Sequence, residues 1–187
     1  MNKKLLFITE AAMIAALYCV LTIMVQPIAS GPIQFRVSEA LMLLPALLPA
    51  AVPGLYVGCV LANVLLGFGW VDIVFGGLAT LLAALVTRRL AARFGLRPST
   101  GEHRSRQELL REPGLWLLPV PSVIFNALIV GFYLPILMPP ESGAFATAVV
   151  VSMTQLAISE AAVVYLLGIS FLVGVYPFFV RHAKARA

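Results

Sequence analysis

Residues 31–45 of this chain read Gly31-Pro-Ile-Gln-Phe-Arg-Val-Ser-Glu-Ala-Leu-Met-Leu-Leu-Pro45. The run places four polar residues close together between two long apolar segments, namely Gln34, Arg36, Ser38 and Glu39. Gly31-Pro32 is expected to break the first helix, and Ser38 is expected to cap a second one, with Glu39 at its positive end. The run therefore predicts a polar loop at one mouth of a helical bundle, where a ligand is most expected.

The composition outside this run is that of a membrane protein. Of 187 residues, 61% are hydrophobic and only 11% are charged, and the mean hydropathy is +0.99. A soluble domain of this length has too little interior for so much apolar surface, so we expect one all-α integral membrane domain over residues 1–187. The net charge of +5 does not indicate nucleic-acid binding, because the basic residues gather at predicted helix ends and in one loop.

The apolar runs predict the membrane spans. Runs at roughly 5–29, 70–93, 115–138 and 144–178 each supply the approximately 20 residues that a helix needs to cross. The first run is longer than the ~7–15-residue core of a signal peptide, so we expect it to be retained as a span. Prolines interrupt region 39–68, which is therefore one kinked span or two short spans that turn near Ala51–Pro53.

The basic residues decide between these two topologies. With two short spans the chain has six, and both termini lie on the same side as the Arg-rich loop at about 94–113. Arg36 is then the only basic residue on the other side. We therefore predict six transmembrane helices with cytoplasmic termini, residues 100–108 inside and residue 141 outside. The loop itself is expected to face solvent and lipid headgroups rather than to dock a partner.

Polar side chains within apolar spans are costly and indicate a binding site. Tyr56, Cys59, Asn63, Gly67 and Trp70 recur on one face of the third span, and Ser122, Asn126 and Tyr133 do so on the fifth. Together with the acids and the opening run, the predicted substrate-binding residues are Gln34, Arg36, Glu39, Asn63, Trp70, Asp72, Asn126, Tyr133, Gln155 and Glu160. Carboxylates, amides and rings suit a flat molecule rich in hydrogen-bonding groups.

The serines of the spans and an alanine stripe on the first span can be explained by helix packing instead of by ligand or partner binding. Ser122, Ser152 and Ser159 are interpreted as interhelical hydrogen-bonding groups rather than as ligand contacts. Ala11, Ala12, Ala15 and Ala16 form two overlapping Ala-x-x-x-Ala pairs, which allow close helix approach. That stripe either packs inside the bundle or docks a separate membrane protein.

Enzymatic signatures do not appear in the sequence. It contains no phosphate-binding loop, its histidines lack metal-ligand spacing, and Ser159 next to Glu160 is adjacency rather than a catalytic triad. Cys19 and Cys59 stand alone in apolar segments and are interpreted as small core residues. We therefore predict no enzyme activity, no cofactor and no metal.

Three groups of short motifs follow one another along the chain. They are the run Gly31–Leu41, then Pro53-Gly54 with Gly58-Cys59 and Ala62-Asn63, then Asp72–Gly76 with Leu78-Ala79-Thr80. Together they resemble the QueT transporter family over nearly the whole chain. The family tends to carry a Gly-Glu pair in its last helix, where this chain has Ser159-Glu160. The resemblance implies a six-helix substrate-binding subunit, an S component, of an energy-coupling-factor (ECF) transporter in the bacterial plasma membrane.

The resemblance also implies a substrate and partners. The substrate would be a queuosine precursor such as 7-aminomethyl-7-deazaguanine or queuine, bound at the outer face under a lid at residues 31–38. The partners would be an EcfT-like transmembrane coupling protein and two ATPases, with no nucleic acid involved. A guanine-like edge with an aminomethyl cation offers donors that Glu39, Asp72 and Glu160 would accept. The alternatives are an S component for another vitamin-like solute and a small lipid-modifying membrane enzyme.

Overall fold

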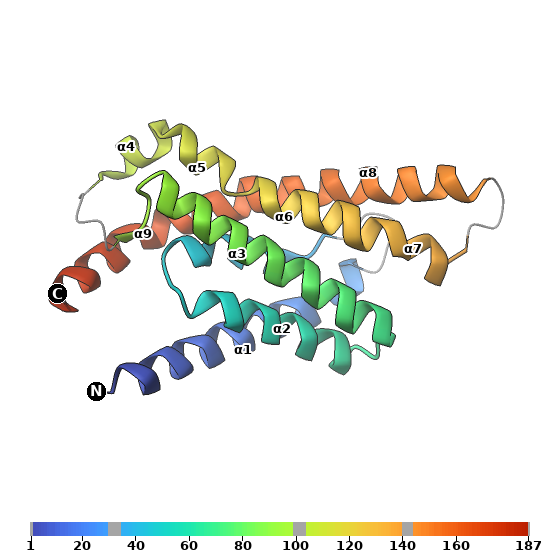
Figure 1. The fold of residues 1–187 in the computed structure, drawn as a ribbon, viewed down its shortest axis with the longest axis horizontal. Coiled ribbons are helices and arrows are strands. Elements are labelled where there is room, and N and C mark those ends of the chain that lie inside the picture. Colours follow the sequence, from blue (N-terminus) through green and yellow to red (C-terminus); the bar gives the residue numbers. More distant parts are fainter. Residues whose placement is uncertain (1, 30–34, 99–103, 140–143, 187) are drawn as a thin grey trace.

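The computed structural model describes residues 2–29, 35–98, 104–139 and 144–186, in which the regular secondary structure is helical and no strand forms (Figure 1). The first half consists of α1 (Lys3–Ala29), the 3₁₀ helix η1 (Val37–Ala46) and α2 (Ala51–Leu65). These three elements pack against one another. The next pass is made by the π-helical turn η2 (Asp72–Gly76) and α3 (Gly77–Arg93).

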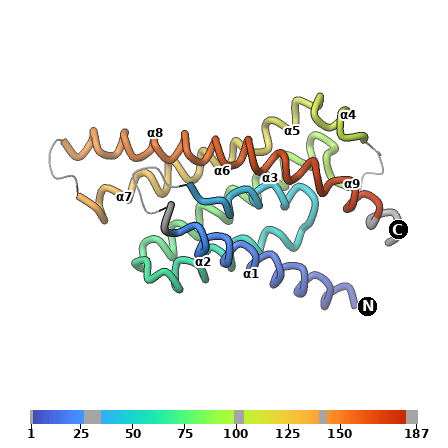
Figure 2. Tube along the Cα trace, turned by 180° about the vertical axis from the view of Figure 1, so that it is seen from behind, coloured from blue at the N-terminus to red at the C-terminus, as the bar shows by residue number. Residues whose placement is uncertain are grey.

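The second half adds two broken rods. After the short helices α4 (Arg106–Arg111) and α5 (Pro113–Leu117), one rod is formed by α6 (Val120–Phe125), the π turn η4 (Asn126–Val130) and α7 (Gly131–Leu137). The other is formed by α8 (Phe145–Val163), the π turn η5 (Val164–Gly168) and α9 (Ile169–Arg186) (Figure 2). Both chain ends lie at the end of the bundle that carries α4 and α5 (Figure 1).

Four segments are long and apolar enough to cross a membrane: Lys3–Gln26, Asp72–Arg93, Pro113–Leu137 and Phe145–Arg181. The predicted all-helical membrane architecture is therefore confirmed. The two shorter apolar helices are η1 and α2, which correspond to the two short predicted spans. That they complete six crossings, with both termini in the cytoplasm, stays a prediction.

Helix η1 lies at the centre of the bundle. Nine consecutive residues, Ser38 to Ala46, are buried in it, and Leu43 and Met42 belong to separate apolar clusters on either side. A 3₁₀ helix rises about 2.0 Å per residue, so ten residues cover about 20 Å, against about 15 Å for an α-helix. The greater rise per residue thus lets this ten-residue segment extend farther along its neighbours than an α-helix of the same number of residues would.

The predicted cap of this helix was wrong. Arg36, not Ser38, is the N-cap residue, and it makes no capping hydrogen bond through its side chain. Ser38 is fully buried and its hydroxyl accepts a hydrogen bond of 2.8 Å from Thr22 of α1. The turn also comes slightly earlier than predicted, between Ala46 and Ala51, because Pro53 fits the first turn of α2, where its missing N–H costs nothing.

Two glycines of α2 bring α1 very close. A Cβ atom added at Gly54 would lie 2.8 Å from the carbonyl oxygen of Ala11, and one at Gly58 would lie 2.8 Å from that of Ala15. Small residues four apart allow such backbone contact. One half of the alanine stripe therefore packs inside the bundle on α2, whereas Ala12 and Ala16 are exposed.

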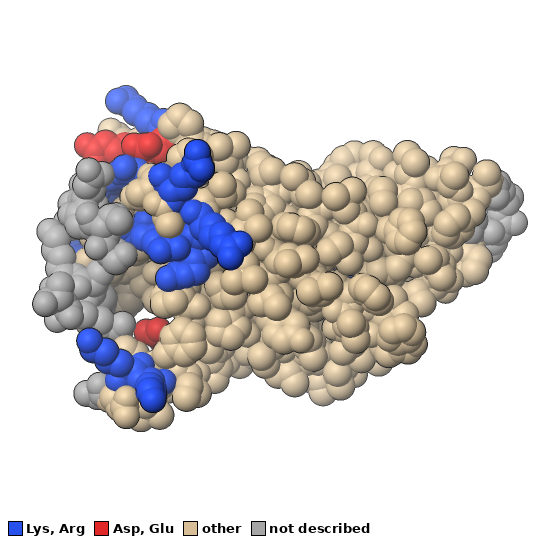
Figure 3. Space-filling model, viewed as in Figure 1, with Lys and Arg blue, Asp and Glu red and all other residues tan. Residues whose placement is uncertain are grey.

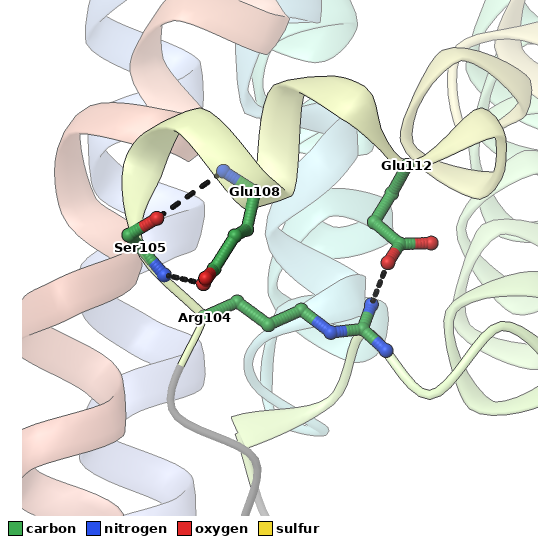
Figure 4. Close-up of polar contacts among 4 residues, drawn as sticks. All are labelled: Arg104, Ser105, Glu108 and Glu112. Atoms are coloured by element: carbon green, nitrogen blue, oxygen red, sulfur yellow. Dashed lines mark hydrogen bonds and ion pairs between the residues drawn. The ribbon is translucent and has the colours of Figure 1, made fainter.

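Basic side chains gather at the end that carries α4 and α5, and the rest of the face seen in Figure 3 is uncharged. At this end Ser105 and Glu108 form a reciprocal capping box that starts α4, and Arg104 lies 3.4 Å from Glu112 (Figure 4). The backbone N–H of Ser105, and then its side chain, lower the pKa of the Glu108 carboxyl below its usual value. The loop thus has its own local structure. The four polar residues named here are exposed or half-buried, whereas Leu96 and Leu109 of the same loop are buried in an apolar cluster.

The orientation of the bundle can be tested by labelling. A membrane-impermeant thiol reagent is expected to miss Ser105→Cys in intact cells and to reach Ala144→Cys, which is exposed at the start of α8. The native cysteines will not interfere, because Cys19 and Cys59 are buried. Labelling of Ser105→Cys without permeabilisation would contradict the predicted topology.

Candidate functional site

A buried carboxyl group on η1 is the first component of the site. The Glu39 side chain is 2% exposed, and its Oε1 atom accepts a hydrogen bond from the Tyr18 hydroxyl of α1. Its Oε2 atom is buried with no hydrogen-bond partner among the described residues. An acceptor left in this state costs free energy, so a hydrogen-bond donor placed against this atom would stabilise it.

A second buried carboxyl group faces the first from α8. Glu160 is 8% exposed and its Oε1 atom accepts a hydrogen bond from the Ser122 hydroxyl of α6. The carboxyl groups of Glu39 and Glu160 interact with each other, and the Asn126 amide lies within reach of both. Helices η1, α6 and α8 therefore meet at a pair of acids with an amide beside it.

Arg36 adds a positive charge next to this pair. Its guanidinium interacts with Glu39, Tyr18 and Tyr133, and it lies 6.0 Å from the centre of the Phe68 ring. Arg36 is half-buried, and a guanidinium over an aromatic face is favourable. The start of η1 is thereby joined to the segment that follows α2, at the edge of the polar cluster.

The other side of the cluster is built around Asp72. The Tyr133 hydroxyl of α7 donates a hydrogen bond of 2.8 Å to Asp72 Oδ1, and the Asn63 side-chain amide donates one of 2.8 Å to the Asp72 backbone carbonyl. Asn63 is 1% exposed, and its Oδ1 atom has no hydrogen-bond partner in the described part of the chain. This is a second buried acceptor that lacks a donor.

Two of the site residues begin π-helical turns. Asp72 is the first residue of η2 and Asn126 is the first residue of η4, and these two turns contact each other. A π turn inserts an extra residue into a helix and re-aims the side chains that follow, and such turns are frequent at functional sites. Two of the π turns in the described residues thus begin at members of the polar cluster, whereas η5 begins at Val164 in an apolar cluster.

Most of the residues predicted from the sequence come together here, and some do not. The cluster contains Arg36, Glu39, Asn63, Asp72, Asn126, Tyr133 and Glu160. Trp70 is 70% exposed, and Gln155 is half-buried on α8 and takes part in none of the contacts above. Gln34 lies outside the described residues, as does the first half of the predicted lid, residues 31–34.

Of two further residues that touch the acids, sequence reasoning missed one and interpreted the other correctly. Tyr18 was not singled out, although it is the one tyrosine in the first apolar run and is 1% exposed. Ser122 was interpreted as an interhelical hydrogen-bonding group, and it does bond across helices, but to Glu160. Within the described residues, no group of three His, Cys, Asp or Glu side chains is arranged to hold a metal ion.

Comparison with known proteins identifies related sequences. The family model described as QueT transporter matches residues 8–177 of the chain. The protein named queuosine precursor transporter QueT from Lactococcus lactis subsp. cremoris (strain MG1363) is 42% identical over 83 residues. The aligned part makes up 43% of this chain and 48% of that relative, so it spans about half of the relative's length. No solved structure matches the chain.

Proposed function

Because the chain belongs to the QueT transporter family, we propose that it is the substrate-binding membrane subunit of an ECF-type transporter that imports a queuosine precursor. The proposed substrate is 7-aminomethyl-7-deazaguanine or queuine, taken up across a bacterial plasma membrane. The similarity to the Lactococcus lactis protein, whose name specifies a queuosine precursor, supports this class of substrate. As a subunit of a transporter the protein would have no enzyme activity of its own.

The observation that carries the proposal is the pair of buried acceptors without donors, Glu39 Oε2 and Asn63 Oδ1. A deazaguanine base offers N–H donors on its ring edge and, where it carries an aminomethyl group, on its ammonium, and a carboxylate or an amide oxygen accepts either. Tyr133 bonds to the Asp72 carboxylate, and Asn63 bonds to the Asp72 backbone carbonyl. The Tyr133 ring centre lies 6.2 Å from that of Phe75, which is 40% exposed, and aromatic rings favour a flat base. The site therefore matches the chemistry of such a base.

The lid and the direction of entry belong to the same proposal. Residues 31–38 would cover the base at the outer face, and the two ends of the described part, Phe35 and Ser38, differ sharply in burial. Phe35 is 41% exposed whereas Ser38 is fully buried. Arg36 between them lies 6.0 Å from the centre of the Phe68 ring and interacts electrostatically with the buried Glu39. A movement of this segment would therefore shift the Arg36 charge relative to the carboxyl pair.

The proposed partners are a transmembrane coupling protein and two ATPases. Hydrolysis of ATP by those partners would reorient the bundle and release the base inside. The exposed half of the alanine stripe, Ala12 and Ala16, offers a surface on which another helix could approach closely. Ala11 and Ala15 are not proposed for docking, since their carbonyl groups lie against α2.

Enlarging the exposed alanines is expected to prevent assembly. Ala12→Leu and Ala16→Leu should lower co-purification of the coupling protein at least tenfold, because the added side chain holds the two backbones apart. Base binding by the isolated subunit should be unchanged. Ala146→Leu, a matched change at an exposed position of α8, should leave assembly intact. Loss of binding together with assembly would show that the whole stripe is internal packing.

Thermal unfolding of the purified chain tests the proposed function. Bound ligand stabilises the folded state, by about 2.7 kcal/mol at a hundred times its Kd, so the precursor bases should raise the melting temperature by several degrees. Riboflavin and thiamine serve as comparison solutes. A shift with one of these instead of the bases would indicate an S component for another solute. Turnover of added lipid without partner proteins would indicate a membrane enzyme.

A further inference from the structure

The Glu39–Glu160 pair places two buried acids side by side, and the recognition of a neutral base would not require two negative charges. Each carboxyl group already holds one hydroxyl donor on its Oε1 atom, from Tyr18 and Ser122 respectively. Both side chains are at least nine-tenths buried, and Oε2 of Glu39 has no partner among the described residues. The two carboxyl groups interact with each other, and two interacting carboxylates repel strongly in a buried site, so both cannot be charged without added positive charge.

The neighbouring groups supply only part of that charge. The charged and titratable side chains that interact with the pair or with its partners come from several elements: Tyr18 on α1, Arg36 on η1, Cys59 on α2, Asp72 on η2 and Tyr133 on α7. Arg36 is the cation among them, and it balances one carboxylate. Arg88 is engaged at the other end of η1, where it donates to the Pro45 carbonyl.

We propose that the Glu39–Glu160 pair binds the ammonium group of the ligand in exchange for a proton that the empty pair holds. This inference rests on the proposed function and assigns one part of the substrate to one part of the site. In the empty state one carboxyl is charged against Arg36 and the other keeps its proton. When the aminomethyl cation enters, that proton leaves to solvent, both carboxylates are charged, and two cations balance them. The overall charge of the site is unchanged.

The exchange makes the pair a selectivity element. A base with an uncharged nitrile in place of the aminomethyl group cannot release the proton and gains no charge-assisted hydrogen bond. The Asn126 amide beside the pair and the acceptor on Asn63 would then serve the ring edge, which both bases share. The protein should therefore prefer the cationic base, and only that base should couple its binding to pH.

Calorimetry of the full chain in lipid nanodiscs tests this. Titration with 7-aminomethyl-7-deazaguanine and with 7-cyano-7-deazaguanine, each in two buffers of different ionisation enthalpy, counts the protons released. We expect about one proton per aminomethyl base and none for the nitrile, with at least tenfold tighter binding of the former. Affinity for the aminomethyl base should fall as the pH is lowered, by at most about tenfold per pH unit, because protons compete for the pair.

Variants separate the pair from its surroundings. Glu160→Gln should abolish proton release and reduce the preference for the cationic base to a few fold, and Glu39→Gln repeats the test if that variant folds poorly. Ser159→Ala is the matched control, because its hydroxyl bonds to Leu156 within α8, and it should keep both properties.

The possible results separate the two proposals. Equal affinity for the two bases, or binding of the cationic base without proton release, overturns the inference and leaves the proposed function standing. Failure of both bases to bind overturns both.

Discussion

Replacing Glu160 with glutamine is expected to weaken binding of the aminomethyl base at least tenfold. The substitution keeps the shape of the side chain, but it removes a negative charge and turns one acceptor into a donor. Loss of a charge-assisted hydrogen bond costs about 1.5–3 kcal/mol, which corresponds to roughly a ten- to hundredfold change in affinity. The Ser122 hydroxyl can still donate to the remaining oxygen, so the bundle should stay folded and able to dock.

Direct calorimetry of the variant provides the measurement. Glu10→Gln is a suitable control, since it makes the same change on α1 about 12 Å along the helix from Tyr18. It should bind the base as the unmodified chain does. An unchanged affinity in Glu160→Gln would move the site toward Glu39 and Asp72.

Introducing a large side chain at Gly58 is expected to have the second large effect. A Cβ atom there would lie 2.8 Å from the Ala15 carbonyl oxygen and 2.9 Å from the Tyr18 Cβ atom. A backbone carbonyl in the middle of α1 cannot turn away, so Gly58→Leu must push α1 and α2 apart. Overpacking of this kind costs about 1–3 kcal/mol or more, and the displaced Tyr18 would also lose Glu39.

Both consequences can be measured on one preparation. Gly58→Leu should lower the melting temperature by several degrees and weaken base binding, because Tyr18 belongs to the same contact. Gly174→Leu is a matched change on α9 at a position with open space around it, and it should affect neither. If Gly58→Leu melted and bound normally, the close α1–α2 contact would not be what positions Tyr18.

The sequence alone determined the class of protein and the positions of its helices. Lipid and protein interior are both apolar, so a long uninterrupted apolar run identifies a membrane-spanning helix whether that helix faces lipid or other helices. The predicted runs at 5–29 and 70–93 correspond closely to α1 and to η2 with α3. The same logic found Glu39, Asn63, Asp72 and Glu160, because polar groups in such runs are costly and rare. Their role in binding is a proposal that the experiments above test.

Only the tertiary structure decided which faces meet. Helical periodicity tells which residues of one helix share a face, but an almost uniformly apolar helix does not reveal whether that face points to lipid or to another helix. Trp70 was for this reason expected in the site and is exposed, and the alanine stripe divides between α2 and the surface. The contacts of Tyr18 with Glu39 and of Glu160 with Ser122 join residues far apart in the chain. They arise because the buried 3₁₀ helix places Glu39 between α1 and α8, and no local pattern encodes that placement.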